Sequence, residues 1–224
     1  MAKITSASFL EFISKHRIGL LLIAILSMII GSPFIHDIFH YRVIPDIFIT
    51  IIFIFGIYAI SGIKMHIYIA LGLAIPMFSG IWSFHLYGNL KLLVFGQLFA
   101  VLFTGFVIIL LIKFISNEEE ITKEVIFAAV VVYLLMAMMW AYIYMILAYF
   151  NPGSLSIPEG SARDTFQYIY FSFVTITTLG YGDIAPLTNK ASSLVILEAV
   201  TGQIYLVVVV AWLVGMYVSR RSRN

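Results

Sequence analysis

Long apolar runs constrain the fold of this 224-residue chain more than any other feature of its sequence. Six runs contain about 18 residues or more, which is enough for a helix to cross about 30 Å of hydrocarbon. Charged residues make up only 11% of the chain and lie mostly in the short intervals between the runs. We therefore predict an all-α integral membrane protein with spanning helices at residues 18–35, 44–63, 67–86, 92–115, 121–150 and 191–218.

The composition excludes several classes of protein. A mean hydropathy of +1.06 and 62% hydrophobic residues exclude an ordinary soluble domain. The net charge of +2, with no basic patch between aromatic residues, gives no reason to expect a nucleic-acid partner. The absence of cysteine excludes disulfides, thiol catalysis and thiolate metal sites. The residues of this sequence offer no combination of a nucleophile with a base and no cluster of metal ligands. We therefore expect neither an enzyme nor a cofactor.

The first apolar run begins near Arg17, and we expect it to be retained in the protein. Gly31-Ser32-Pro33 predicts the end of a helix and not the cleavage site of a secretory signal. Residues 1–17 form a predicted cytoplasmic N-terminal segment. An apolar helical face in this segment either lies on the membrane surface or is a frayed leader, and its residues are Phe9, Leu10, Phe12 and Ile13.

The basic residues predict the orientation in the membrane, because cytoplasmic loops carry an excess of Lys and Arg. If the N-terminus is cytoplasmic, nine basic residues lie inside: Lys3, Lys15, Arg17, Lys64, Lys113, Lys123, Arg220, Arg221 and Arg223. Four lie outside: Arg42, Lys91, Arg163 and Lys190. We therefore predict a multi-pass protein of the plasma (inner) membrane with both termini in the cytoplasm. The interval between the fifth and sixth runs then enters the membrane from outside.

This interval contains a short aromatic helix and a glycine-rich stretch. Residues 165–176 are too few to span the bilayer and predict a re-entrant helix, with Asp164 or Ser161 as its N-cap. Gly180 and Gly182 then alternate with Leu179 and Tyr181 directly after Thr178. Because glycine tolerates positive φ, such a run can turn its carbonyl oxygens in one direction. Oxygens that face one axis can replace the water shell of a monovalent cation.

The stretch Thr178-Leu179-Gly180-Tyr181-Gly182-Asp183 resembles the signature of potassium channels, with leucine in place of the commoner valine. The resemblance implies a selectivity filter in which the carbonyls of Thr178, Leu179, Gly180 and Tyr181 coordinate K⁺ and Gly182 completes the turn. Asp183 would lie at the outer mouth, and K⁺ would be the permeant ion. Because one loop cannot surround an ion, and channels with one such loop per chain are tetramers, we expect a homotetramer in membrane lipid.

The resemblance also implies residues that support the filter, and we assign this role to Thr177, Tyr170, Phe171 and Glu198. The family often has a tryptophan pair where this chain has Tyr170-Phe171. In some members an indole hydrogen bond steadies the aspartate that corresponds to Asp183, and this chain offers no indole at these positions.

Three features of the last run are candidates for a gate or a conduit. Gly202 is either a gating hinge, which we favour, or a packing contact. On a helical period from Gly202, an apolar conduit would be lined by Gln203, Leu206, Val210 and Val214. Glu198 is an ionisable residue within an apolar helix, where its charge is costly. It either faces the ions or, as we favour, accepts hydrogen bonds from the helix behind the filter.

The first four runs lack the charges of a voltage sensor. The fourth has Lys91 and Lys113 near its ends and no arginine between them. Residues 18–116 are therefore predicted to be a four-helix domain without a voltage sensor, and residues 117–224 a pore domain. The chain resembles bacterial six-helix channels that are not voltage-gated. A potassium transporter with filter-like loops and a non-conducting membrane protein that keeps the loop stay open as alternatives.

Overall fold

The computed structural model describes residues 16–39, 43–157 and 165–221, and it is helical throughout these ranges apart from the connecting turns. This confirms the predicted all-α membrane fold. The helices are α2 (Arg17–Phe39), α3 (Ile44–Ala59), α4 (Lys64–Tyr87), α5 (Leu90–Asn117), α6 (Lys123–Phe150), α7 (Thr165–Ile176) and α8 (Asn189–Arg221). A single isolated bridge pairs Leu155 with Pro186 within the described part of the chain.

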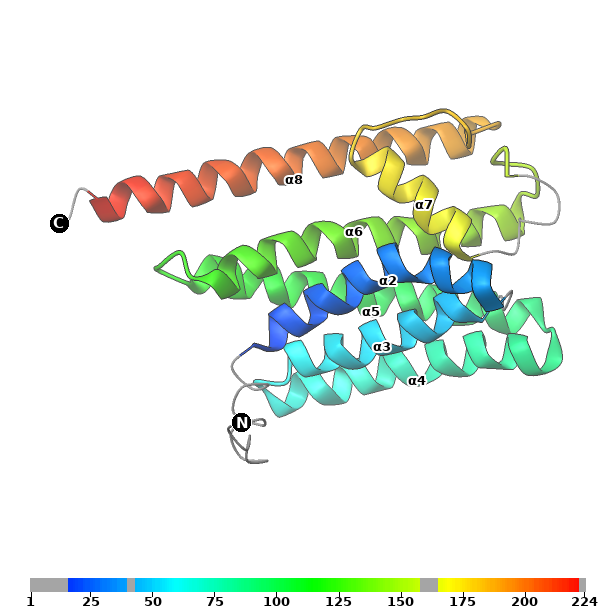
Figure 1. The fold of residues 1–224 in the computed structure, drawn as a ribbon, viewed down its shortest axis with the longest axis horizontal. Coiled ribbons are helices and arrows are strands. Elements are labelled where there is room, and N and C mark those ends of the chain that lie inside the picture. Colours follow the sequence, from blue (N-terminus) through cyan, green and yellow to red (C-terminus); the bar gives the residue numbers. More distant parts are fainter. Residues whose placement is uncertain (1–15, 40–42, 158–164, 222–224) are drawn as a thin grey trace.

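Helices α2 to α6 each run antiparallel to the one before, α8 runs antiparallel to α6, and the short α7 lies between α6 and α8 (Figure 1). The start of α2 and the end of α8 lie at one end of the molecule. The first residues of α7 and of α8 lie toward the opposite end, so the chain enters and leaves the α7 region from the same side. This is the arrangement of a re-entrant segment.

Two predicted helix ends are wrong. The predicted end at Gly31-Ser32-Pro33 is absent, because α2 continues through Pro33 to Phe39. The helix can continue through Pro33 because a proline removes only one helical donor. Helix α3 packs beside this part of α2, since the Phe48 ring lies 3.4 Å from the position that a Gly31 Cβ would occupy.

The second predicted span, residues 44–63, is shorter in the structure because α3 ends at Ala59. A tighter turn replaces the helix there, in which the Ser61 N–H and hydroxyl both donate to the Tyr58 carbonyl, at 3.2 and 2.7 Å. Five of the described helices are long and apolar enough to cross a membrane, and α3, with 16 residues, is shorter than those five.

Helix α6 is the centre of the packing, since it contacts α2, α5, α7 and α8. Its Tyr142 and Tyr144 are among the largest fully buried side chains. Helices α4 and α5 approach closely where Gly80 meets Gly96, since a Cβ on Gly80 would lie 2.6 Å from the Gly96 Cα. Small residues that let backbones approach in this way are typical of membrane helices.

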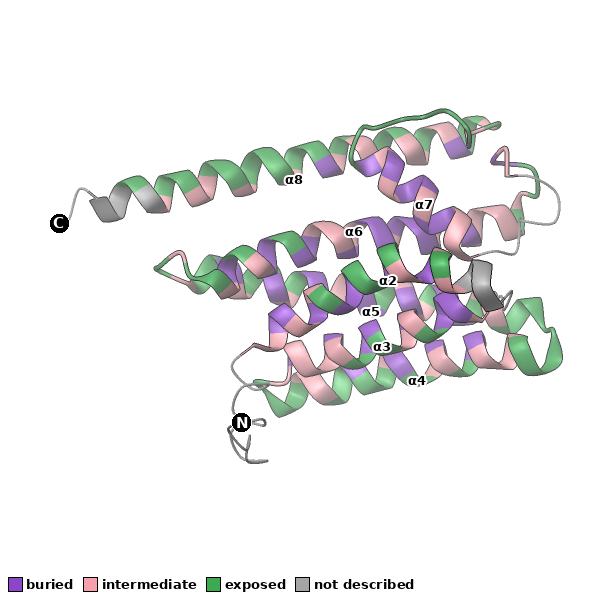
Figure 2. Cartoon of the chain, in the orientation of Figure 1, coloured by how far each residue is buried: buried purple, intermediate pink, exposed green. Residues whose placement is uncertain are grey.

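Helix α8 is the least covered of the long helices. Figure 2 shows exposed residues along most of its length, whereas α6 is largely buried. Only 11% of its most apolar window is buried in the chain. The exposed residues are mostly apolar, and they include Ile196, Val200, Ile204, Val207 and Val210.

Candidate functional site

Helix α7 carries the glycine-rich stretch at its C-terminal end. It has 12 residues and packs on α6 and α8. The predicted N-cap residues, Asp164 and Ser161, lie outside the described residues. The partial negative charge at the C-terminus of the helix faces the region where the glycine-rich stretch begins, which favours a cation there.

The backbone of this stretch alternates in handedness. Thr178, Gly180 and Gly182 have positive φ values of 60°, 57° and 79°, and the residues between them do not. Alternation of left- and right-handed residues turns successive carbonyl groups toward the same side, whereas the extended conformation of a strand points them to opposite sides. Two of these three positions are glycine, which adopts positive φ without steric cost.

The N–H groups at the start of the stretch are directed back into α7. Thr178 N–H donates to the Thr175 carbonyl at 2.9 Å, and the N–H groups of Leu179 and Gly180 share the Val174 carbonyl at 3.0 and 3.2 Å. Among the described residues, no hydrogen bond ends on a carbonyl oxygen of residues 178–182. The first three N–H groups of the stretch are therefore satisfied by α7, and the carbonyl oxygens of residues 178–182 stay available to a ligand as far as the described residues show.

Thr178 is the one described residue other than glycine with positive φ. This conformation is unfavourable for a β-branched residue. Backbone strain of this kind costs about 1–3 kcal/mol and is found mostly at functional sites. Here the bond from the Thr178 N–H to the end of α7 holds the strained residue in place.

Side chains of the stretch are largely uncovered in the single chain. Leu179 is 55% exposed and Tyr181 is 69% exposed. A Cβ added at Gly180 or Gly182 would likewise meet nothing within 4 Å, so the single chain leaves the stretch largely open.

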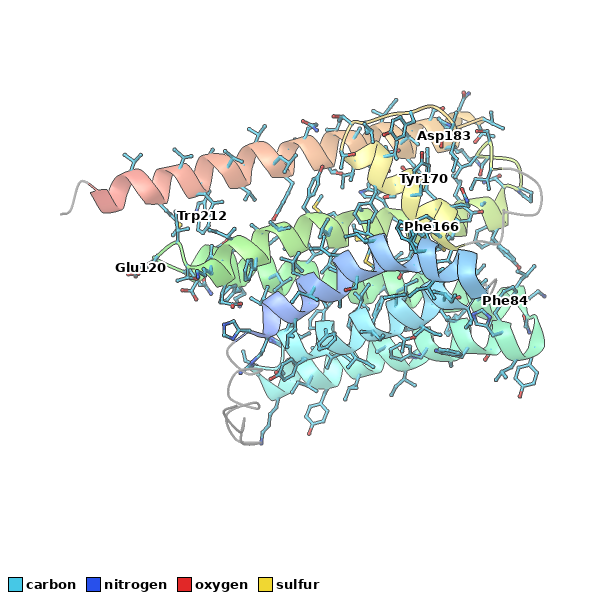
Figure 3. All side chains as sticks on the ribbon, viewed as in Figure 1. Phe84, Glu120, Phe166, Tyr170, Asp183 and Trp212 are labelled. Carbon is cyan, nitrogen blue, oxygen red and sulfur yellow. The ribbon has the colours of Figure 1, made fainter. Side chains whose placement is uncertain are left out.

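Asp183 is held by a tyrosine in place of an indole. The Tyr170 hydroxyl donates to Asp183 Oδ2 at 2.7 Å, and both side chains lie at the same end of the molecule in Figure 3. This hydrogen bond holds the pKa of the Asp183 carboxyl below its usual range. The carboxylate in turn raises the pKa of Tyr170 to about 12. The Tyr170 hydroxyl therefore makes the hydrogen bond that tryptophan makes in the channels that the sequence resembles. The resemblance alone did not predict this bond.

Phe171, the second residue of this pair, points to the other side of α7. It is buried and its ring meets that of Tyr144 edge to face, with centroids 5.0 Å apart. Thr177 is exposed and its hydroxyl donates to the Phe173 carbonyl at 2.7 Å. Of the predicted support residues, Tyr170 thus contacts Asp183, Phe171 contacts α6 and Thr177 bonds to the last turn of α7.

Glu198 is completely buried and joins three helices. The hydroxyls of Tyr144 on α6 and Ser172 on α7 donate to its two carboxyl oxygens. The Ser172 hydroxyl also lies 2.6 Å from the Ala137 carbonyl. The carboxyl group therefore faces α6 and α7 and not the exposed side of α8.

Tyr144 and Ser172 were not among the site residues predicted from the sequence. A signal was available, because Ser172 is a small polar residue in a strongly apolar helix and Glu198 is a lone carboxyl in another. Two such residues in elements that must pack together are candidates for a hydrogen bond.

Gly202 lies against the C-terminal end of α7. A Cβ added there would be 2.5 Å from Ile176 Cγ1 and 3.1 Å from the Ile176 carbonyl oxygen. That oxygen also accepts a hydrogen bond of 2.8 Å from the Tyr133 hydroxyl. Gly202 therefore allows a close approach of α8 to the last residue of α7, two residues before Thr178, and its assignment as a hinge stays a prediction.

The predicted conduit residues lie on the uncovered part of α8. Gln203, Leu206, Val210 and Val214 are all exposed. The neighbouring Val207 and Val208 are exposed as well, at 67% and 57%. The face of α8 that lines a conduit therefore stays a prediction.

Hydrogen bonds attach two parts of this region, the start of α7 and the segment after Asp183, to the rest of the chain. Thr165, the first residue of α7, lies 3.5 Å from Asp46 Oδ1, and His85 Nε2 lies 2.8 Å from Asp46 Oδ2. After the glycine-rich stretch, the Ala185 N–H donates to the Ser156 hydroxyl at 2.7 Å. Both the start of α7 and the segment after Asp183 are thus fixed to the rest of the chain.

Comparison with known proteins gives one finding for this region. Residues 121–219 match the model of a family described as an ion channel. No curated protein and no solved structure matches the chain significantly. The matched residues include α6, α7, the glycine-rich stretch and most of α8, and the match indicates ion channel activity.

Proposed function

We propose that this ion channel is a homotetrameric, potassium-selective channel that conducts passively through a filter formed by residues 178–182. The supporting observation is the row of free carbonyl oxygens on a backbone of alternating handedness. Such oxygens can replace the hydration shell of K⁺. In this proposal the carbonyls of Thr178, Leu179, Gly180 and Tyr181 form the ion sites.

Exposure within the single chain supports four copies around an axis. The filter side chains and most of α8 are uncovered, and the uncovered residues of α8 are apolar. Apolar side chains that line a shared axis, or pack on a neighbouring α8, would account for this surface. The conduit residues Gln203, Leu206, Val210 and Val214 would then lie below the filter, and Gly202 would be the hinge.

The Asp183 carboxylate would concentrate cations at the outer mouth, since the Tyr170 hydroxyl keeps it ionised to lower pH. Glu198, Tyr170, Phe171 and Thr177 would support the filter through the contacts described above. The excess of basic residues on one side of the predicted spans supports an orientation in the plasma (inner) membrane with both termini in the cytoplasm. The fourth long helix, α5, carries no arginine, so gating by a voltage sensor of the usual kind is not part of the proposal.

The test is ion flux into liposomes that contain the purified chain. We expect K⁺ flux without ATP, block by Ba²⁺ and little Na⁺ flux. Gly180→Ala should abolish K⁺ flux, because alanine at φ +57° is strained and distorts the carbonyl row. The matched control is Gly72→Ala, since a Cβ there meets nothing within 4 Å and Gly72 is exposed on α4.

Unchanged selectivity in Gly180→Ala would refute the filter, and an assembly other than a tetramer on mass measurement would refute the stoichiometry. Flux that saturates at a low, carrier-like turnover would favour a transporter. A folded tetramer without any flux would favour a non-conducting membrane protein.

A further inference from the structure

The C-terminal end of α7 is capped in part by a side chain from another helix. The last four carbonyl oxygens of a helix have no partner within it and must be satisfied elsewhere. In α7 these oxygens belong to Phe173, Val174, Thr175 and Ile176. The N–H groups of residues 177–180 donate to the first three. The fourth, the Ile176 carbonyl oxygen, accepts a hydrogen bond of 2.8 Å from the Tyr133 hydroxyl on α6.

The Tyr133 hydroxyl holds the peptide group between Ile176 and Thr177. The carbonyl oxygen of this group accepts from Tyr133, and its N–H donates to the Phe173 carbonyl at 3.2 Å. Because a peptide group is planar, its N–H and its carbonyl can rotate only together, so rotation breaks these bonds. Thr178 follows directly with its strained φ of 60°. Such strain persists only where the surroundings hold it, and the Tyr133 bond is part of these surroundings.

The ring of Tyr133 also contacts α8. It stacks on the Tyr205 ring, with the centroids 6.1 Å apart and an angle of 19° between the ring planes. The Tyr205 hydroxyl donates to the Ala129 carbonyl of α6 at 2.7 Å. The two stacked tyrosines therefore differ in what their hydroxyls hold, since Tyr133 bonds to the end of α7 and Tyr205 bonds to α6.

We propose that Tyr133 is a positioning residue of the glycine-rich stretch, whose hydroxyl holds the Ile176 carbonyl and so keeps the following carbonyl oxygens in the orientation that selects K⁺. The effect on selectivity rests on the proposed function, because it requires residues 178–182 to be the filter. Tyr133 acts through the backbone of α7 and contacts no ion. Loss of its hydroxyl removes the partner that the described part of the chain gives to the Ile176 carbonyl.

The test replaces Tyr133 by phenylalanine, which keeps the ring and its stack on Tyr205 and removes only the hydroxyl. Hydrogen–deuterium exchange is measured on the full-length protein in lipid nanodiscs, at the amides of residues 178–180, which donate to α7. We expect exchange there to become about fivefold faster, as for the loss of one neutral hydrogen bond. In liposomes, the ratio of Na⁺ flux to K⁺ flux should rise.

The matched control is Tyr205→Phe, which removes the other hydroxyl of the stacked pair and leaves the bond from Tyr133 to Ile176 in place. It should change neither the exchange at residues 178–180 nor the flux ratio, and both variants should keep the assembly size of the unchanged protein. Unchanged exchange in Tyr133→Phe, or an equal rise in both variants, would overturn the proposal. An unchanged flux ratio in a conducting Tyr133→Phe protein would overturn it as well.

The two measurements separate this proposal from the proposed function. If the unchanged protein carries no selective K⁺ flux, the proposed function fails. Amide exchange requires no ion flux, so it still decides whether Tyr133 holds the glycine-rich stretch.

Discussion

Replacing Gly202 by alanine tests whether this glycine is needed for packing or for hinge motion. The new Cβ would lie 2.5 Å from Ile176 Cγ1, a distance that real side chains do not adopt, so either Ile176 or α8 must move. Overpacking of this kind costs about 1–3 kcal/mol. For a chain of this size each kcal/mol lowers the unfolding midpoint by about 2–4 °C, so we expect a decrease of about 4–8 °C for a cost in the middle of this range.

The double variant with Ile176→Ala separates the two explanations, because it removes the Cγ1 atom that the new Cβ would meet. Ile176→Ala by itself leaves a cavity and should cost about 2–5 kcal/mol. Adding Gly202→Ala to it should then cost much less than in the unchanged protein. The Ile176 carbonyl oxygen at 3.1 Å is backbone and stays, so the rescue should be partial.

The assay is thermal unfolding of the detergent-solubilised protein, with K⁺ flux measured on the same four proteins and Gly72→Ala as control. A packing contact predicts a strong coupling energy between the two positions. Equal costs of Gly202→Ala in both backgrounds would refute the packing argument. A loss of flux that is identical in both backgrounds, with unchanged stability, would instead support the hinge.

Two further predictions concern the hydrogen bonds around the proposed filter. In Tyr170→Phe the pKa of Asp183 should rise toward its usual value, because its main stabilising donor is lost, so K⁺ flux should fall at a higher external pH during acidification than in the unchanged protein. In Glu198→Gln single-channel conductance should be unchanged, because the carboxyl faces Tyr144 and Ser172 and not the ions, whereas Glu198→Ala should lower the unfolding midpoint.

These two predictions have clear contrary results. An unshifted pH profile in Tyr170→Phe would mean that the hydroxyl does not control the ionisation of Asp183. A large fall of conductance in Glu198→Gln, with stability preserved, would mean that the carboxyl faces the ions. In Glu198→Ala the Tyr144 hydroxyl is left without an acceptor, which should cost about 1–3 kcal/mol, whereas the Ser172 hydroxyl keeps the Ala137 carbonyl and should cost less.

Hydropathy alone located all the long helices, because the length and apolarity that a helix needs in lipid are local properties of the sequence. It placed some ends wrongly, at Pro33 and after Ala59, because helix ends depend on neighbours as well as on punctuating residues. Pro33 stays inside α2, whose neighbour α3 supplies the Phe48 ring beside Gly31.

The backbone conformation of the glycine-rich stretch was predictable for a similar local reason. The alternation of glycine with other residues encodes the backbone handedness at 180 and 182, and the structure shows positive φ at both. The positive φ of Thr178 was not encoded in this way, since threonine has no preference for it. It follows from the bonds that residues 178–180 donate to the end of α7.

The partners of the polar residues were decided by tertiary structure. The sequence shows that Glu198 and Gln97 are polar residues in apolar helices, and each therefore needs a partner. Only packing brings Tyr144 and Ser172 to Glu198 and leaves Gln97 at a cavity, because these contacts join residues that are far apart in the chain. The lengths of the helices and the turns of the glycine-rich stretch thus depend on local sequence, whereas the pairing of buried polar groups depends on which helices meet and at what register.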